Sequence, residues 1–152
     1  MIRFRSAALS KSGRNVEFTA FFFFIAKEKG GKQVYKILIV DDTQLNRELL
    51  KDILCEEYDI LEAENGREAL DIVCFEMTNI AAILLDLIMP VMDGFTFLEE
   101  LQKLNIMDKV PILVISGEKS VQNEKKCFDY GVSDFIGRPF NSVLVTRRVQ
   151  NV

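Results

Sequence analysis

The chain of 152 residues contains no histidine. This absence excludes a Ser-His or Cys-His catalytic triad, and it means that the chain cannot itself hold a phosphohistidine. The chain has only three cysteines, Cys55, Cys74 and Cys127, which are widely spaced and form no Cys-x-x-Cys pair. Neither a disulfide framework nor a zinc site is indicated, so we expect a reduced, cytoplasmic protein. Any chemistry must depend on carboxylates, hydroxyls or a metal ion.

The chain also lacks an apolar run long enough to span a bilayer. Its phenylalanine-rich run, Phe18–Ala26, has nine residues, whereas a membrane-spanning helix needs roughly 20. Basic residues precede this run as in a signal peptide, but no small-residue cleavage site follows it. We therefore expect no association with a membrane.

The first 33 residues differ from the rest in charge. Residues 1–33 carry seven Lys/Arg and two Glu, while residues 34–152 carry twelve Lys/Arg and twenty-one Asp/Glu. The acidic main body argues against direct binding of nucleic acid, which normally requires a basic surface.

Residues 1–33 are interpreted as a leader outside the folded domain. The codons of Lys29-Gly30-Gly31-Lys32 can contain a purine-rich ribosome-binding signal, and Val34 is then a candidate initiator. The leader is expected to be disordered or not part of the native protein, and the alternative is an extra packed helix.

From residue 34 onwards, apolar strand patterns alternate with helical patterns. Strands are predicted at Val34–Val40, Tyr58–Ala63, Ala81–Leu85, Val110–Ile115 and Asp134–Ile136. Apolar residues at helical spacing lie between them: Leu45, Leu49, Leu50, Ile53 and Leu54; then Ala69, Leu70, Ile72 and Val73; then Phe95, Leu98, Leu101 and Leu104. Two more helices are expected after Lys119 and after Asn141. Five such units predict an α/β fold, a doubly wound parallel sheet with helices on both faces.

Chemically active side chains follow several of these strands. Asp41-Asp42 ends the first strand, Asp86 the third and Ser116 the fourth, and Arg138-Pro139 follows the fifth. In open parallel sheets the site lies at the carboxyl ends of the strands. Three converging carboxylates would repel one another and raise a pKa unless a cation lay among them, and such oxygen ligands suit Mg²⁺. A magnesium-dependent phosphoryl site is therefore predicted.

Each of these features taken singly has a simpler interpretation. An Asp-Asp pair after a strand is commonly a turn and helix cap, and the segment MPVMDG at 89–94 is also read as a plain loop. It is their placement at the ends of alternate elements of one sheet that favours a functional site.

Four segments of the chain resemble the response regulator receiver domain of bacterial two-component systems. They are KILIVDD, ILLDLIMPVMDG, PILVISG and GVSDFIGRPF. The resemblance covers residues 34–152, and the separations of Asp41, Asp86, Ser116 and Arg138 agree with the family's usual spacing. It implies a flavodoxin-like (βα)5 fold with strand order 2-1-3-4-5. It also implies a non-enzymatic signalling domain that phosphorylates and dephosphorylates only itself.

By this resemblance, Asp86 is the phosphoacceptor, which receives a phosphoryl group from a sensor histidine kinase or a phosphotransfer protein. Asp42 and Asp86, with the backbone carbonyl of Ile88, are expected to ligate Mg²⁺, and Asp41 to act through a bound water. The metal would neutralise charge as an anion approaches the anionic nucleophile.

The resemblance also assigns the switching residues. Ser116 is expected to turn its hydroxyl onto the phosphoryl oxygens, and Phe135 to swing inward behind it. This movement would remodel the surface around the fourth helix and fifth strand for a downstream output domain or protein. A homodimer through the fourth helix, fifth strand and fifth helix is a further expectation.

Two features depart from the family pattern. Arg138 stands where the family almost always has lysine, and the chain stops at Val152 in the expected last helix. We expect Arg138 to bind the phosphorylated Asp86 and the Arg138–Pro139 peptide to be cis. The chain is either a stand-alone receiver or part of a longer regulator.

Two alternatives stay open at this point. A pseudo-receiver would be an interaction module that does not switch on phosphorylation, and only Arg138 favours it. An aspartate-nucleophile phosphatase needs a second aspartate two residues after Asp86, where this chain has Ile88.

Overall fold

The structure is a computed structural model that describes residues 34–117 and 121–152. In this part of the chain, strands and helices alternate: β1 (Lys36–Val40), α2 (Gln44–Leu54), β2 (Asp59–Ala63), α3 (Gly66–Glu76), the short 3-10 helix η1 (Met77–Asn79), β3 (Ile80–Asp86), α4 (Gly94–Lys103), β4 (Ile112–Ser116), α5 (Val121–Tyr130), β5 (Asp134–Gly137) and α6 (Ser142–Gln150). The leader predicted at 1–33, with its phenylalanine-rich run, lies outside the described residues.

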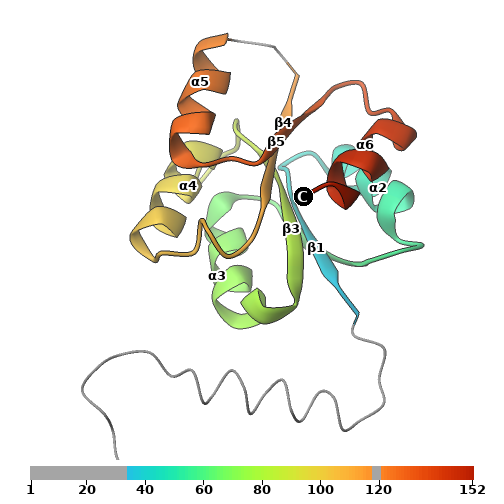
Figure 1. Cartoon of the computed structure of the whole chain (residues 1–152), viewed down its shortest axis with the longest axis horizontal. Helices are drawn as coiled ribbons and strands as arrows, with labels where there is room; N and C mark the ends of the chain where they lie inside the picture. The colour runs from blue at the N-terminus through green and yellow to red at the C-terminus, as the bar shows by residue number, and fades with distance from the viewer. Residues whose placement is uncertain (1–33, 118–120) are drawn as a thin grey trace, which may run out of the picture. The chain divides into compact units, whose positions relative to one another are not determined.

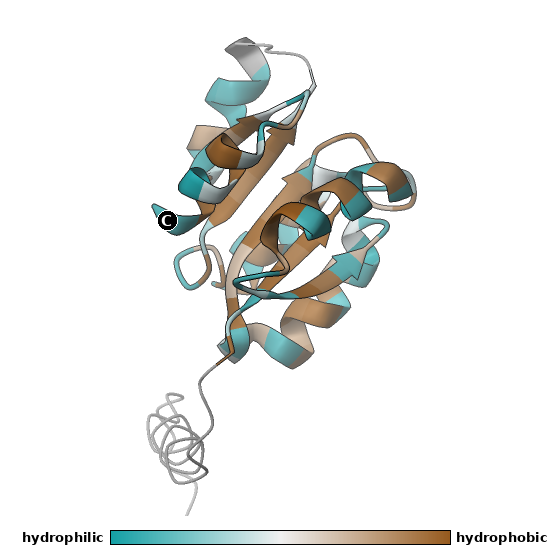
Figure 2. Cartoon of the chain, turned by 90° about the vertical axis from the view of Figure 1, so that its right-hand side faces the viewer, coloured by the Kyte–Doolittle hydropathy of each residue, from teal (hydrophilic) through white to brown (hydrophobic). Residues whose placement is uncertain are grey.

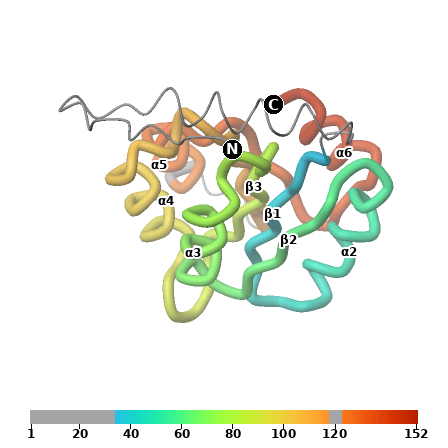
Figure 3. The backbone as a smooth tube through the Cα atoms, turned by 90° about the horizontal axis from the view of Figure 1, so that it is seen from below, coloured from blue at the N-terminus to red at the C-terminus, as the bar shows by residue number. Residues whose placement is uncertain are grey.

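The strands form one five-stranded sheet in the order β2-β1-β3-β4-β5, and all neighbouring pairs are parallel. Helices α3, α4 and α5 cover one face of the sheet, and α2 and α6 cover the other (Figures 1 and 3). The predicted flavodoxin-like α/β fold is therefore confirmed, as are all five strands and all five helices.

Both faces of the central strands are buried, which explains why their sequences are continuously apolar. Along β1, Leu38 and Val40 belong to the core under α3, α4 and α5, whereas Ile37 and Ile39 belong to the core under α2 and α6. In Figure 2 the strands are coloured mainly as hydrophobic, and the helices have mixed character. No helix within residues 34–117 and 121–152 has the length and apolar character needed to cross a membrane.

The apolar stripe predicted for α2 is partly wrong. Leu45 and Leu49 are 61% and 44% exposed, whereas Arg47, Leu50 and Leu54 form the buried face. The two sets lie on adjacent ridges of one helix, so helical spacing alone does not decide which ridge meets the sheet. The buried ridge includes the charged residue Arg47, and a search for apolar residues at helical spacing does not identify it.

The fourth strand begins two residues later than predicted, at Ile112 rather than Val110. Pro111 has no N–H to donate to a strand ladder, and only its carbonyl takes part, accepting a hydrogen bond from the Ile83 N–H at 3.0 Å. In α4, Phe97 is fully buried although it lies outside the predicted stripe, and Leu104 of that stripe is 47% exposed just beyond the helix.

The segment MPVMDG connects β3 to α4 by a close approach of backbone. Asp93 caps α4 by accepting a hydrogen bond from the Thr96 N–H at 2.8 Å. The Gly94 N–H donates to the Leu87 carbonyl, and a Cβ on Gly94 would lie 2.6 Å from the Asp86 carbonyl oxygen. Only glycine fits at this position, and the contact holds the loop against the end of β3.

Candidate functional site

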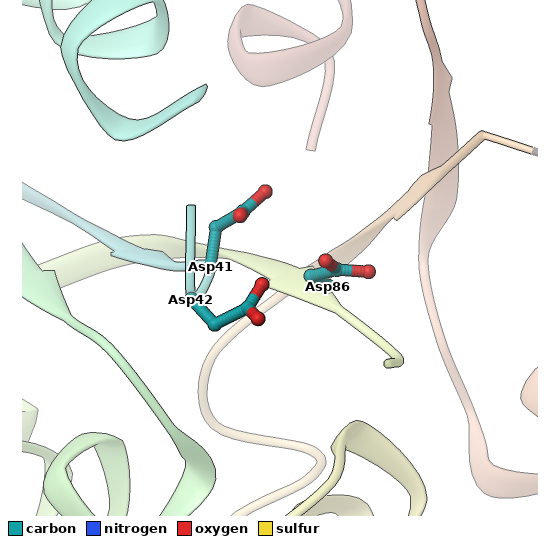
Figure 4. A group of neighbouring side chains, drawn as sticks. All are labelled: Asp41, Asp42 and Asp86. Carbon is teal, nitrogen blue, oxygen red and sulfur yellow. The ribbon is translucent and has the colours of Figure 1, made fainter. Parts of the chain in front are cut away.

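Three aspartates gather beyond the carboxyl ends of β1 and β3 (Figure 4). Asp41 and Asp42 follow β1, and Asp86 is the last residue of β3. One carboxylate oxygen from each lies within 4.8 Å of the others. Asp41 and Asp86 are buried, while Asp42 is exposed. The predicted convergence of the three carboxylates is therefore present, and its oxygen donors are the kind that Mg²⁺ prefers.

Asp41 is held from several sides. Its carboxylate accepts hydrogen bonds from the Thr43 N–H at 2.8 Å and from Asn46 Nδ2 at 3.2 and 3.1 Å. Its backbone N–H donates to the Ala63 carbonyl at the end of β2, and its backbone carbonyl accepts from Arg47 Nη1 at 2.8 Å. The first turn of α2 and the neighbouring strand thus determine where this carboxylate lies.

The Asp86 carboxylate accepts fewer hydrogen bonds than that of Asp41. Burial raises its pKa above the ordinary value, while the hydrogen bond and charge of Arg138 and the Ile88 N–H, at 3.3 Å from Asp86 Oδ1, oppose that rise. The charge of Asp41 raises the pKa further, as the smallest of these effects. The predicted direction is thus correct, but burial rather than repulsion between carboxylates is the main cause.

Arg138 supplies positive charge to the site. Its Nη2 lies 2.8 Å from Asp41 Oδ2 and 3.0 Å from Asp86 Oδ2. Burial lowers the pKa of Arg138, but its bonds to Asp86 and Asp41 outweigh this effect and the net shift is upward. Its Nε is buried without a hydrogen-bond partner among the described residues. The Arg138–Pro139 peptide is cis, as predicted.

Ser116 and Phe135 lie on the two neighbouring strands next to this site. Ser116 ends β4 opposite Gly137 of β5, and its carbonyl accepts a hydrogen bond from the Arg138 N–H at 3.0 Å. Phe135 is half-buried against the core and packs edge-on against Phe128 of α5, with ring centroids 5.1 Å apart. Ser116 is therefore bonded to Arg138 across the β4–β5 pair, and Phe135, on β5, precedes Arg138 by three residues.

Two residues of the site were not predicted from the sequence. Asn46 and Arg47 on α2 contact the side chain and the backbone of Asp41, respectively. Arg47 is buried, and its guanidinium also pairs with Glu64 at 2.9 Å. The sequence did contain a signal for Arg47. It lies on the same helical ridge as Leu50 and Leu54, and a charged residue on a buried ridge needs a buried partner.

The sequence profile described as "Response regulator receiver domain" matches residues 37–150, which is most of the chain. The chain belongs to the response regulator receiver family. Its five-stranded sheet in the order 2-1-3-4-5 is that of this family, and the match does not favour the phosphatase alternative.

Curated relatives of this receiver include both partners of two-component systems by name. It is 38% identical over 116 residues to transcriptional regulatory protein SrrA of Staphylococcus aureus (strain NCTC 8325 / PS 47), covering 76% of this chain and 46% of that protein. It is 29% identical over 117 residues to sensor histidine kinase TmoS of Ectopseudomonas mendocina, covering 77% of this chain and 12% of that protein. The receiver thus spans less than half the length of either relative.

Solved structures agree with this assignment. Chemotaxis protein CheY4 of Vibrio cholerae superposes with a TM-score of 0.72 at 28% identity, covering 78% of this chain and 98% of that one. The receiver domain of Francisella response regulator 1452 superposes with a TM-score of 0.69 at 29% identity. The match covers 77% of this chain and 94% of that one.

Proposed function

We propose that this receiver accepts a phosphoryl group on Asp86 from a phosphohistidine of a sensor histidine kinase or phosphotransfer protein. The observation that supports this is the placement of a buried Asp86 carboxylate beside Asp41, Asp42 and Arg138. The phosphohistidine must lie outside these 152 residues, because they contain no histidine.

In the proposed reaction, an Asp86 carboxylate oxygen attacks phosphorus as the phosphorus–nitrogen bond of phosphohistidine breaks. The bonding electrons pass to the imidazole, and Asp86 becomes an acyl phosphate. Attack by water later releases inorganic phosphate and restores the carboxylate. The receiver therefore processes only its own phosphoryl group, as a signalling domain does.

Magnesium is the cofactor that the donor set fits. Asp42, Asp86 and the backbone carbonyl of Ile88 would hold it directly, and Asp41 would hold it through water. A bound Mg²⁺ offsets the negative charge that accumulates when a phosphoryl group meets a carboxylate. The exposure of Asp42 leaves this side of the cluster open to solvent.

The switch proposed for this receiver involves Ser116, Phe135 and Arg138. After phosphorylation, Ser116 and Arg138 would bind phosphoryl oxygens, and Phe135 would turn inward, which changes the surface of α5, β5 and α6. That surface is the proposed contact for an output domain, a downstream protein or a second copy of the receiver. We place the receiver in the cytoplasm, with no direct contact to membrane or nucleic acid.

The test is intact-mass spectrometry after incubation with Mg²⁺ and acetyl phosphate. The expected result is a gain of one phosphoryl group that is labile to base and is lost in Asp86→Asn. The matched control is Asp71→Asn, the same change at an exposed position of α3, which should still be phosphorylated. A phosphoryl group on Asp86→Asn would refute the assignment, and sustained turnover of a phosphomonoester would favour the phosphatase.

One observation favours the pseudo-receiver as a second candidate. Arg138 Nη2 contacts both Asp41 and Asp86, so the arginine could hold the domain in one state. NMR spectra of α5 and β5 with and without beryllofluoride, which mimics the acyl phosphate, separate the two functions. A switching receiver changes these spectra. No change in this chain, together with a change in Arg138→Lys, would show the pseudo-receiver.

A further inference from the structure

The Asp41 carboxylate has its acceptor capacity filled. A carboxylate offers about four lone-pair sites on its two oxygens. Oδ1 accepts from the Thr43 N–H at 2.8 Å and from Asn46 Nδ2 at 3.2 Å. Oδ2 accepts from Asn46 Nδ2 at 3.1 Å and from Arg138 Nη2 at 2.8 Å. Three of the four bonds therefore come from the segment that begins α2, and only one comes from the side of Asp86.

Among these donors, Asn46 is the side chain that contacts both oxygens of Asp41. The backbone of Asp41 is already held by Ala63 and Arg47. Two side-chain torsions are left to determine, the staggered Cα–Cβ torsion and the rotation of the carboxylate about its Cβ–Cγ bond. The second of these torsions has a broad energy profile in aspartate and does not select one orientation by itself. A carboxylate accepts but does not donate, so the amide nitrogen of Asn46 must be the atom that faces it.

We propose that Asn46 is a positioning residue of the phosphoryl site. Its amide sets the Asp41 carboxylate so that Oδ2 faces Asp86 and Arg138, and Oδ1 is turned back to the start of α2. This inference rests on the proposed function, since it assigns Asn46 to the magnesium and phosphoryl chemistry proposed for Asp86. Asn46 acts through Asp41 and touches no reacting atom.

The consequence concerns metal affinity. Loss of a hydrogen-bond partner that orients a group of a metal site typically weakens metal binding by about 10–100-fold, and we expect the lower end of this range here because Asp41 would act through a water. Without Asn46, Oδ1 and Oδ2 each lose a donor and the carboxylate can rotate away from Asp86. We expect Asn46→Leu, which keeps the size of the side chain but removes its donors, to bind Mg²⁺ about tenfold more weakly.

The experiment is a calorimetric titration of the full chain with MgCl2 at neutral pH, without a phosphodonor. The matched control is Gln44→Leu, because Gln44 lies on the same turn of α2 and its amide donates to the exposed Glu48, at 2.7 Å, rather than to Asp41. Urea unfolding of each metal-free variant shows that it is folded. Asn46→Ser serves as the test variant if Asn46→Leu does not fold.

The expected outcome is weaker Mg²⁺ binding by Asn46→Leu and unchanged binding by Gln44→Leu. Equal affinities of the unchanged chain and Asn46→Leu would overturn the positioning role and leave the proposed function intact. A loss of Mg²⁺ affinity in Gln44→Leu as large as in Asn46→Leu would also overturn it. The loss would then follow from any substitution on this turn and not from the bond between Asn46 and Asp41. Absence of Mg²⁺ binding by the unchanged chain would overturn the metal site itself, and with it this inference.

Discussion

Arg138 Nη2 lies between two carboxylates, 2.8 Å from Asp41 Oδ2 and 3.0 Å from Asp86 Oδ2. These two residues also belong to the cluster that fits Mg²⁺. A guanidinium and a divalent cation that approach the same oxygens repel each other and compete for the same lone pairs. The arginine therefore acts as the counter-charge of the metal-free site.

Replacing Arg138 by methionine is expected to strengthen Mg²⁺ binding about tenfold, or about 1.4 kcal/mol, because the metal no longer displaces a cation. Calorimetric titration at neutral pH measures the affinity. Arg148→Met is the matched control, since Arg148 pairs with Asp134 at 2.6 Å at the opposite end of β5. An unchanged or lower affinity of Arg138→Met would show that the guanidinium does not compete with the metal.

Gly94→Ala is expected to lower the free energy of unfolding by about 2 kcal/mol or more, the typical cost of forcing atoms into a packed site. The added Cβ would lie 2.6 Å from the Asp86 carbonyl oxygen and 2.7 Å from Leu87 Cα, which are backbone atoms that cannot rotate away. Gly137→Ala is the control, because a Cβ there meets nothing within 4 Å, and it should change stability by less than about 0.5 kcal/mol. Urea unfolding of both variants gives the comparison, and equal stabilities would contradict the close packing at Gly94.

The three cysteines are expected to differ in reactivity. Cys55 and Cys74 are exposed and Cys127 is buried, and burial raises the pKa of the Cys127 thiol above its ordinary value of 9.0 despite the nearby charge of Lys126. Iodoacetamide should therefore label the native chain at Cys55 and Cys74 and reach Cys127 only in urea, as read by intact mass. Rapid labelling of Cys127 in the native chain would contradict its burial.

The same shift predicts the pH dependence of stability. A thiol with a raised pKa in the folded state favours folding below its unfolded pKa, and this contribution is lost as the pH rises through the folded value. The decline in unfolding free energy above about pH 9 should thus be shallower in Cys127→Ala than in the unchanged chain. The change of unfolding free energy with pH, and not its absolute value, tests whether the pKa of Cys127 is raised in the folded chain.

A chain that starts at Val34 is expected to unfold with the same free energy as the full chain. Residues 34–152 form one compact unit, and their sheet is covered on both faces by helices of that unit. Urea unfolding of the two chains makes the comparison. A loss beyond about 2 kcal/mol, which is large for a change outside a core, would show that residues 1–33 stabilise the domain.

Much of this receiver could be predicted from local sequence. Continuously apolar stretches such as Ile37–Val40 and Ala81–Leu85 indicate burial on both faces, and their alternation with helical patterns indicates a parallel sheet. The first predicted strand began too early, because Val34 and Tyr35 are exposed and precede β1. The parallel topology then brings Asp41, Asp42 and Asp86 to one edge without further information. These inferences need only the periods of strands and helices and the direction of the chain.

Other features depended on contacts between residues far apart in sequence. Helical spacing grouped Leu45 and Leu49 with Leu50, and only packing of α2 on the sheet decided that the ridge with Arg47 is the buried one. The cause of the raised pKa of Asp86 also required the fold, because burial depends on the elements that surround the residue.

The sequence by itself determined the order of the elements and the residue types at the strand ends, because both follow from local patterns of polarity. Only the tertiary structure decided that Asn46 and Arg47 hold Asp41 and that Arg138, 97 residues away, shares one nitrogen between Asp41 and Asp86. A hydrogen bond is made or lost by changes of a few tenths of an ångström in the donor–acceptor distance and by changes in direction. Periodicity carries no such information, so these contacts follow only when the strands and helices have packed together.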